Sequence, residues 1–203
     1  MRRNRTARPG ITAEKIKDEI RVELRNIILY RQELLKPIDR LDYEEVQKKI
    51  VAFAGAVYHF KERLAAWVKK RGLVTRPGIM DIACSSIPLQ VCGDLFNAKK
   101  HGGNNNDSKL DLELSEMKLQ TANETIGIRY DGQMKTGDLN RAVPYCVEIY
   151  CSENRTLGDA VRYISRAFSQ WTPVIRTIGL LDDSDSLDAR LLMEIEPFAQ
   201  DEP

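Results

Sequence analysis

A polar stretch between residues 90 and 101 holds the side chains of this chain that are best suited to acid–base or phosphate chemistry. It contains a carboxylate, Asp94, an amide, Asn97, and an imidazole, His101. At about 100° per helical residue, these side chains and Gln90 fall within an arc of roughly 60°, so a helix would present them on one face. An imidazole near a carboxylate is a common pair of groups for general acid–base catalysis near neutral pH. The spacing predicts a catalytic group of His101, Asn97 and Asp94, with Lys100, Lys99 and Gln90 as ligand or phosphate contacts.

The same stretch also has a purely structural interpretation. An amphipathic helix in a bundle exposes its polar face to water, and this solvation needs no functional role to explain it. A histidine in the last helical turn also interacts favourably with the helix dipole and can bond the terminal carbonyls. The apolar residues of the stretch lie on the opposite side of the helical wheel: Val91, Cys92, Leu95, Phe96 and Ala98. The sequence leaves both interpretations open, with the structural one as the default.

Length, charge and composition limit the classes of protein to which the chain can belong. It has 203 residues, of which 42% are hydrophobic, and its 31 Lys and Arg nearly balance 30 Asp and Glu, for a net charge of +1. These values are typical of one globular domain and argue against a protein that coats nucleic acid. No apolar run reaches the ~18 residues of a membrane span, and no apolar signal core follows the basic start. We therefore expect a cytoplasmic protein without a membrane partner.

Cysteine and histidine spacing argues against a metal site. The two histidines, His59 and His101, are far apart, and the sequence has no C-x-x-C pair and no zinc-finger spacing. His59, with Glu62 and Arg63 beside it, is expected at the surface or boundary of a helix. No metal and no other cofactor is expected. Four cysteines are expected to be reduced and mostly buried: Cys84, Cys92, Cys146 and Cys151.

Apolar residues that recur at steps of three and four predict four helices. The first covers residues 12–36 and the second covers residues 42–72, where the apolar pattern is clearest. A third helix is predicted over residues 87–101, and a fourth over residues 156–179 with a kink or restart at Pro173. The predicted caps are Thr12 and Asp42 at the amino ends of the first two helices and Gly72 at the carboxyl end of the second.

Between the third and fourth helices the apolar period changes from 3.6 to 2, which predicts strands. Residues 110–114 alternate between leucine and acidic side chains, in a strand that extends through Lys118 with an irregularity. Two further strands are predicted over residues 126–130 and 143–149, and the turn residues between them favour an antiparallel meander. The fold class is therefore α+β, mainly α: a four-helix bundle with a small three-stranded antiparallel sheet inserted between helices 3 and 4.

The chain divides into three parts. Residues 1–11 form a disordered basic arm with four arginines, residues 12–181 a single helical-bundle domain with the sheet inserted at 109–151, and residues 182–203 an acidic C-terminal tail. The arm could touch phosphates, so RNA is a further candidate partner. The apolar residues 191–195 of the tail could add a strand or dock on the body. The acidic residues at its start are expected to be solvated: Asp182, Asp183, Asp185 and Asp188.

The polar ending of the third helix, in which Asn97 is followed four residues later by His101 and Gly102, resembles that of the HEPN superfamily. These helical domains are common in prokaryotic toxin, defence and mobile-element systems, and the resemblance covers residues 12–101 and 156–179. In active members an Arg, a polar residue and, several residues on, a His form a metal-independent RNase site across a dimer. In this chain residues 94–96 are Asp, Leu and Phe where that Arg would stand, so the guanidinium that stabilises the transition state is missing.

This departure favours a non-enzymatic, HEPN-like binding or accessory protein that acts as a homo-oligomer or with another protein. The alternative is a metal-independent ribonuclease or nucleotide-modifying enzyme centred on His101, in which Asn97 and Lys100 position a phosphate.

Overall fold

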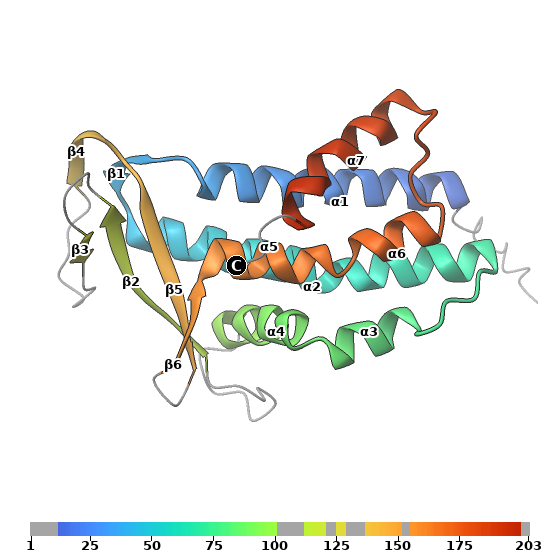
Figure 1. Ribbon diagram of the computed structural model, residues 1–203, viewed down its shortest axis with the longest axis horizontal. Coiled ribbons are helices and arrows are strands. Elements are labelled where there is room, and N and C mark those ends of the chain that lie inside the picture. Colours follow the sequence, from blue (N-terminus) through green and yellow to red (C-terminus); the bar gives the residue numbers. More distant parts are fainter. Residues whose placement is uncertain (1–11, 101–111, 121–124, 129–136, 152–154, 200–203) are drawn as a thin grey trace, which may run out of the picture.

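The computed structural model describes residues 12–100, 112–120, 125–128, 137–151 and 155–199. Within these residues, seven helices and six strands form an α+β fold that is mainly α, which confirms the predicted fold class. The long helices lie side by side as a bundle, and the strands gather at one end of it (Figure 1). The predicted basic arm lies outside the described residues.

The first two helices begin and end where the sequence predicts. α1 (Ala13–Leu34) starts after Thr12, whose hydroxyl oxygen accepts a hydrogen bond from the amide of the third helical residue at 3.2 Å. α2 (Tyr43–Arg71) starts after Asp42, whose carboxylate accepts the equivalent amide at 3.0 Å. These caps satisfy amides that have no partner inside the helix. Gly72 ends α2 at a φ of 64°, in the left-handed region that glycine adopts without strain.

α2 forms the centre of the bundle, because its apolar residues face more than one neighbour. It packs against α1, against α4 (Ile87–Lys100) and against α5 (Ala160–Ser169). Val57 and Phe60 are fully buried. The indole N–H of Trp171 donates to the backbone carbonyl of Val57 at 3.2 Å, which joins the segment after α5 to the middle of α2.

Two short helices adjoin the longer ones, and the second of them lies inside the range predicted for the fourth helix. α3 (Ile79–Ser85) precedes α4 at a bend of 83°, and α6 (Thr172–Thr177) follows α5. Pro173 lies in the first turn of α6, where a missing N–H costs no helical hydrogen bond, so the predicted restart at this proline is confirmed. Among the described helices, none by itself has the length and hydrophobicity to cross a membrane, and only the bent α3–α4 pair meets that test when its two parts are joined.

The fourth predicted helix begins later than the sequence indicates. Thr156 lies in β6 (Arg155–Asp159), and α5 starts only at Ala160. Gly158 has a φ of 101°, which is incompatible with a helix. Asp159 then caps α5, since its carboxylate accepts the amide of the third helical residue at 2.9 Å.

The main sheet has the strand order β3–β2–β5–β6, and each neighbouring pair is antiparallel. The register of β2 (Leu112–Gln120) against β5 shifts between Leu114 and Met117, which is the irregularity expected in this strand. β3 (Thr125–Ile128) pairs with one edge of β2 and β5 (Tyr145–Cys151) pairs with the other. This order differs from the predicted meander, in which β5 would pair with β3.

The difference arises from a pair of strands that the sequence analysis did not predict. β4 (Gly137–Val143) pairs with β1 (Ile38–Leu41), which lies in the connection between α1 and α2. The chain then returns as β5 along β2, so the inserted segment contributes strands to two separate sheets.

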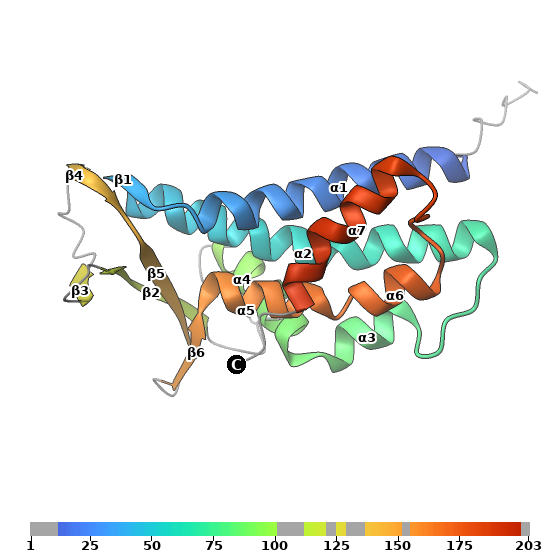
Figure 2. The same cartoon turned by 45° about the horizontal axis from the view of Figure 1, so that its top comes forward.

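A further helix, α7 (Ser186–Ala199), occupies much of the predicted acidic tail. Leu191, Ile195 and Phe198 are buried, and Figures 1 and 2 show α7 lying across α1. Of the two outcomes considered for residues 191–195, the structure therefore shows docking on the body, in the form of a helix.

Candidate functional site

The polar stretch predicted from the sequence lies on α4, and the structure describes the side chains of three of its six candidate site residues. The amide of Gln90 donates a hydrogen bond to the backbone carbonyl of Cys84, which bridges the bend between α3 and α4. Asp94 and Asn97 are half-buried on the same helix. His101 and the side chains of Lys99 and Lys100 lie outside the described residues. The structure thus brings Gln90, Asp94 and Asn97 to one helix and gives Gln90 a structural contact.

α4 approaches α2 closely because each helix presents a glycine to an aromatic ring of the other. The ring of Phe96 from α4 lies on Gly55 of α2, and a Cβ atom at Gly55 would collide with that ring. The ring of Tyr58 from α2 lies on Gly93 of α4, where a Cβ atom would be 2.8 Å from Cε2 of Tyr58. This reciprocal packing fixes which side of α4 faces α2, and with it the direction of the polar stripe.

His59 lies at the edge of this contact between α2 and α4. Its ring meets the ring of Phe96 edge to face, with 5.0 Å between the centroids, and its Nδ1 is 2.9 Å from the Glu62 carboxylate. The side chain is 43% exposed, in agreement with the boundary position expected from the sequence. The structure therefore places one imidazole beside the helix that carries Asn97, a proximity that sequence spacing did not show.

Lys61 is a functional candidate that the sequence analysis missed. It is only 6% exposed, and its Nζ lies 3.0 Å from the centroid of the Tyr58 ring. Within the described part of the chain, it is the one buried residue with a cationic side chain, and an aromatic face replaces the usual carboxylate partner. Its spacing was a usable signal, because a lysine four residues after Val57 and three before Leu64 falls on the apolar stripe of α2.

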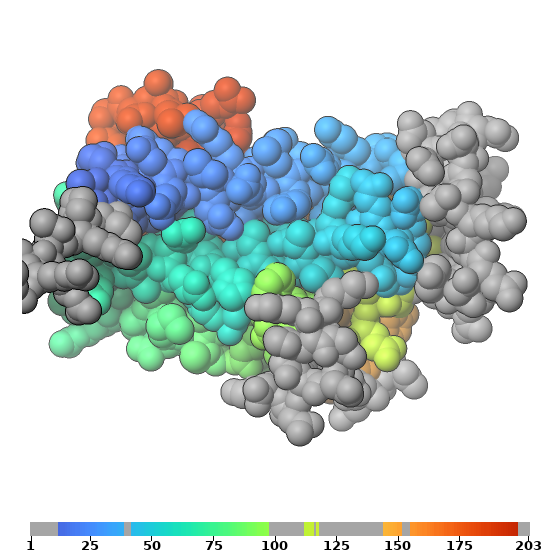
Figure 3. Space-filling model, turned by 180° about the vertical axis from the view of Figure 1, so that it is seen from behind, coloured from blue at the N-terminus to red at the C-terminus, as the bar shows by residue number. Residues whose placement is uncertain are grey.

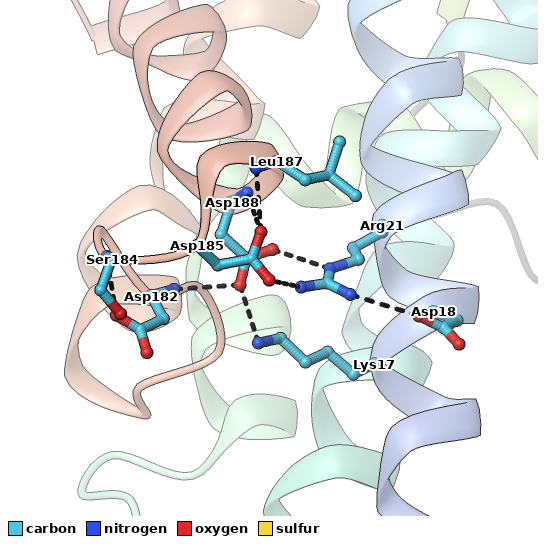
Figure 4. Close-up of polar contacts among 8 residues, drawn as sticks. All are labelled: Lys17, Asp18, Arg21, Asp182, Ser184, Asp185, Leu187 and Asp188. Atoms are coloured by element: carbon cyan, nitrogen blue, oxygen red, sulfur yellow. Dashed lines mark hydrogen bonds and ion pairs between the residues drawn. The ribbon is translucent and has the colours of Figure 1, made fainter.

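A partly buried polar cluster joins α1 to the start of α7 (Figure 4). The Asp188 carboxylate is fully buried and accepts a hydrogen bond from Nε of Arg21 at 2.7 Å. Its other oxygen lies 2.7 Å from Nζ of Lys17. Asp185 binds the same guanidinium at 2.9 Å, and its other oxygen accepts the amides that begin α7. The expectation of a solvated acidic group is therefore wrong for Asp188, because two cations from α1 compensate its burial.

The pKa values of this cluster follow from its contacts. Burial by itself would raise the pKa of Asp188, but hydrogen bonds from Arg21 and Lys17 outweigh burial and hold that pKa below its usual value of 3.8. The hydrogen bond to Asp188 raises the pKa of Arg21 above its ordinary range. Asp188 and Arg21 are thus held in their ionised forms, and the cluster fastens α7 to α1.

Two grooves run along the flanks of α7. The groove between α1 and α7 has a volume of about 290 Å³, and its apolar residues include Leu29, which is 52% exposed. Its charged residues carry both signs: Arg25, Arg190 and Glu194. The second groove, of about 540 Å³, lies between α6 and α7 and includes Met193, which is 65% exposed.

A third cavity, of about 460 Å³, opens where α1, β1 and α2 meet. Lys49 lies in its wall, 2.9 Å from the Glu45 carboxylate and 3.6 Å from that of Glu33. The hydrogen bond to Glu45, followed by the charges of both carboxylates, raises the pKa of Lys49, so this lysine is cationic and already paired. Burial raises the pKa of Tyr145, another lining residue, to about 12, so its phenol is neutral.

The described residues hold no grouped set of metal ligands, and their cysteines differ in burial. No group of three or more His, Cys, Asp or Glu side chains is placed there to hold a metal ion. Cys92 is buried, and its burial raises the pKa of its thiol, while Cys84 is exposed. Cys146 and Cys151 are half-buried, so only one of the four cysteines is fully buried as expected.

Comparisons with known proteins add no relative to this picture: no protein-family model matches the chain, and no curated protein or solved structure matches it.

Proposed function

We propose that the chain is a non-enzymatic binding or accessory protein with a HEPN-like bundle, of the kind found in prokaryotic toxin, defence or mobile-element systems, and that it acts as a homodimer. The observation that supports this proposal is the groove between α1 and α7. It exposes Leu29 in an apolar floor, and large apolar side chains exposed in a groove are typical of protein-binding surfaces.

The charges of the groove favour a second copy of the chain as its occupant. Arg25 and Arg190 stand with Glu194 around the apolar floor, so the surface carries both signs. In a two-fold contact the same surface faces itself, and an arginine of one copy can then meet the glutamate of the other. Arg190 and Glu194 form an exposed pair at 2.8 Å within one copy, and such a pair exchanges partners at little cost.

Replacing Leu29 with glutamate is expected to weaken this dimer. The variant Leu29→Glu puts a charge in the apolar floor of the groove and should raise the dissociation constant by about tenfold or more. Sedimentation equilibrium over a range of concentrations measures this constant. The matched control is Val22→Glu, because Val22 is 54% exposed on the same helix but does not line the groove. A wild-type protein that stays monomeric, or equal effects of both variants, would contradict the proposal.

The contacts of α4 favour binding over catalysis. Gln90, a predicted phosphate contact, donates its amide to a backbone carbonyl, and the residues beside Asp94 and Asn97 interlock with α2. The wild-type protein is therefore expected to leave mixed RNA intact when it is incubated in EDTA, as judged by gel electrophoresis of the RNA.

A ribonuclease or nucleotide-modifying enzyme centred on His101 is the second proposal. The observation in its favour is His59, which supplies an imidazole paired with Glu62 beside Phe96. In the RNA assay this enzyme would cleave without metal, lose activity in His101→Ala, and lose part of it in His59→Ala. Cleavage with that pattern would replace the binding proposal, whereas cleavage unaffected by both variants would indicate contamination.

A further inference from the structure

The exposed apolar side chains of the described residues concentrate in the segment 69–87, which we call the basic rim. Four of the eight large hydrophobic residues that are exposed lie in it: Leu73 at 38%, Val74 at 84%, Met80 at 49% and Ile87 at 65% exposure. Single exposed apolar residues are common on protein surfaces, but several within nineteen residues of one segment indicate a surface that binds a protein or a membrane.

The basic rim also carries an excess of positive charge. Four basic residues stand against one acidic residue, in a chain whose total net charge is +1. The single carboxylate, Asp81, accepts a hydrogen bond from the Gly78 amide at 3.1 Å, which holds it at the start of α3. The basic residues are all exposed: Lys69, Lys70, Arg71 and Arg76. The rim therefore presents apolar side chains with cationic flanks.

The fold explains why these side chains project outward. Ile79 and Ala83 occupy the buried side of α3, which leaves Met80 and Cys84 on its exposed side. The bend between α3 and α4 then leaves Ile87 exposed at the first position of α4. In Figures 1 and 2 the loop after α2 and helix α3 follow the outer edge of the molecule, and Figure 3 shows α3 and α4 on the side opposite α7.

The shape of the rim separates it from the grooves beside α7. None of its residues lines the three cavities described above. A partner helix needs a groove, whereas a lipid surface accepts apolar side chains that project from an edge. Basic residues beside those side chains attract the anionic headgroups of that surface.

We propose that the basic rim docks on the surface of a membrane that contains anionic lipids. Val74, Met80 and Ile87 enter the boundary between headgroups and acyl chains, and Lys69, Lys70 and Arg71 lie among the lipid phosphates and carboxylates. The protein does not span the bilayer in this state. The expectation of no membrane partner rested on the lack of a spanning apolar run, which does not bear on surface docking.

Vesicle flotation of the full-length protein tests this proposal. We expect wild-type protein to float with phosphatidylcholine vesicles that contain about 30 mol% phosphatidylserine and to stay behind with vesicles of phosphatidylcholine alone. Binding should decrease steeply when about 0.5 M salt is added, since salt screens exposed charges. Equal binding to both vesicle types, or no binding to either, would overturn the proposal.

Two pairs of variants assign the binding to the rim. Neutralising Lys69 and Lys70 with glutamine should lower the partition coefficient by about thirtyfold, whereas the same change at exposed Lys15 and Lys48 removes equal charge outside the rim and should have little effect. Val74→Glu should weaken binding by about tenfold and Val22→Glu should not. Circular dichroism checks that each variant is folded. If a rim variant and its control weaken binding equally, or if the rim variants change the oligomeric state and not flotation, the assignment to a lipid surface is wrong.

Discussion

Asp188→Asn is expected to lower the free energy of unfolding by about 3 kcal/mol, because it leaves two cations of α1 beside a buried neutral amide. The carboxylate has no exposed area, and the side chains of its partners Lys17 and Arg21 are only 16% and 15% exposed. Denaturation by urea, followed by circular dichroism, measures the loss. The matched control is Asp183→Asn, because Asp183 is exposed in the same acidic segment, and its effect should stay within about 0.5 kcal/mol.

The pH dependence of this loss identifies its origin. The pKa of Asp188 is lower in the folded protein than its usual value of 3.8. Ionisation of Asp188 therefore stabilises the fold, and this stabilisation is fully present at pH values well above 3.8. This contribution disappears as the pH falls through the lowered pKa. The wild type and Asp188→Asn should therefore converge in stability as the pH falls below about 4. A difference that is constant from neutral pH into acid would show that packing, and not charge, accounts for the effect.

Gly55→Ala is expected to destabilise the protein by about 2 kcal/mol, although alanine favours an isolated helix by up to about 1 kcal/mol over glycine. The reversed sign follows from the Phe96 ring, which occupies the place of the added methyl group. Thermal or urea denaturation measures the change. Gly93→Ala should act in the same way through the Tyr58 ring.

A double-mutant cycle provides the control for the glycine prediction. In the background of Phe96→Leu, the smaller side chain makes room for the methyl group, so Gly55→Ala should cost less than half of its effect in the wild type. If the cost is unchanged, the ring of Phe96 is not the obstacle, and the close approach of α2 and α4 has another cause.

The features that the sequence predicted well are those with local causes. Thr12, Asp42 and Gly72 were recognisable as caps because the groups that they satisfy lie within a few residues of them. The irregularity in β2 was likewise visible as a break in its own alternation. A predicted helix boundary was wrong at Thr156, where an apolar period of three and four residues starts inside a strand.

The features that the sequence did not predict depend on distant partners. β4 lacks a clear alternation of apolar and polar residues, and its pairing with β1 joins segments about a hundred residues apart. The pairing therefore could not be predicted from the local sequence of either strand. Asp188 lies in a segment whose acidic composition predicts a solvated side chain, and only the positions of Lys17 and Arg21 explain its burial. At the candidate site, the position of Gln90, Asp94 and Asn97 on one helix was predictable from their spacing, whereas the contact of His59 with Phe96 and the burial of Lys61 required the packing of α2 on α4.

The distance along the chain between Arg21 and Asp188, 167 residues, has a consequence for synthesis on the ribosome. Lys17 and Arg21 of α1 are translated long before Asp188, which carries their counter-charge. Until α7 is translated, the nascent chain lacks the helix that covers this side of α1. A chaperone that binds apolar segments could occupy the uncovered side of α1 during that time. A product truncated before residue 188 would lack these ion pairs, so this side of α1 would stay open to quality-control proteases.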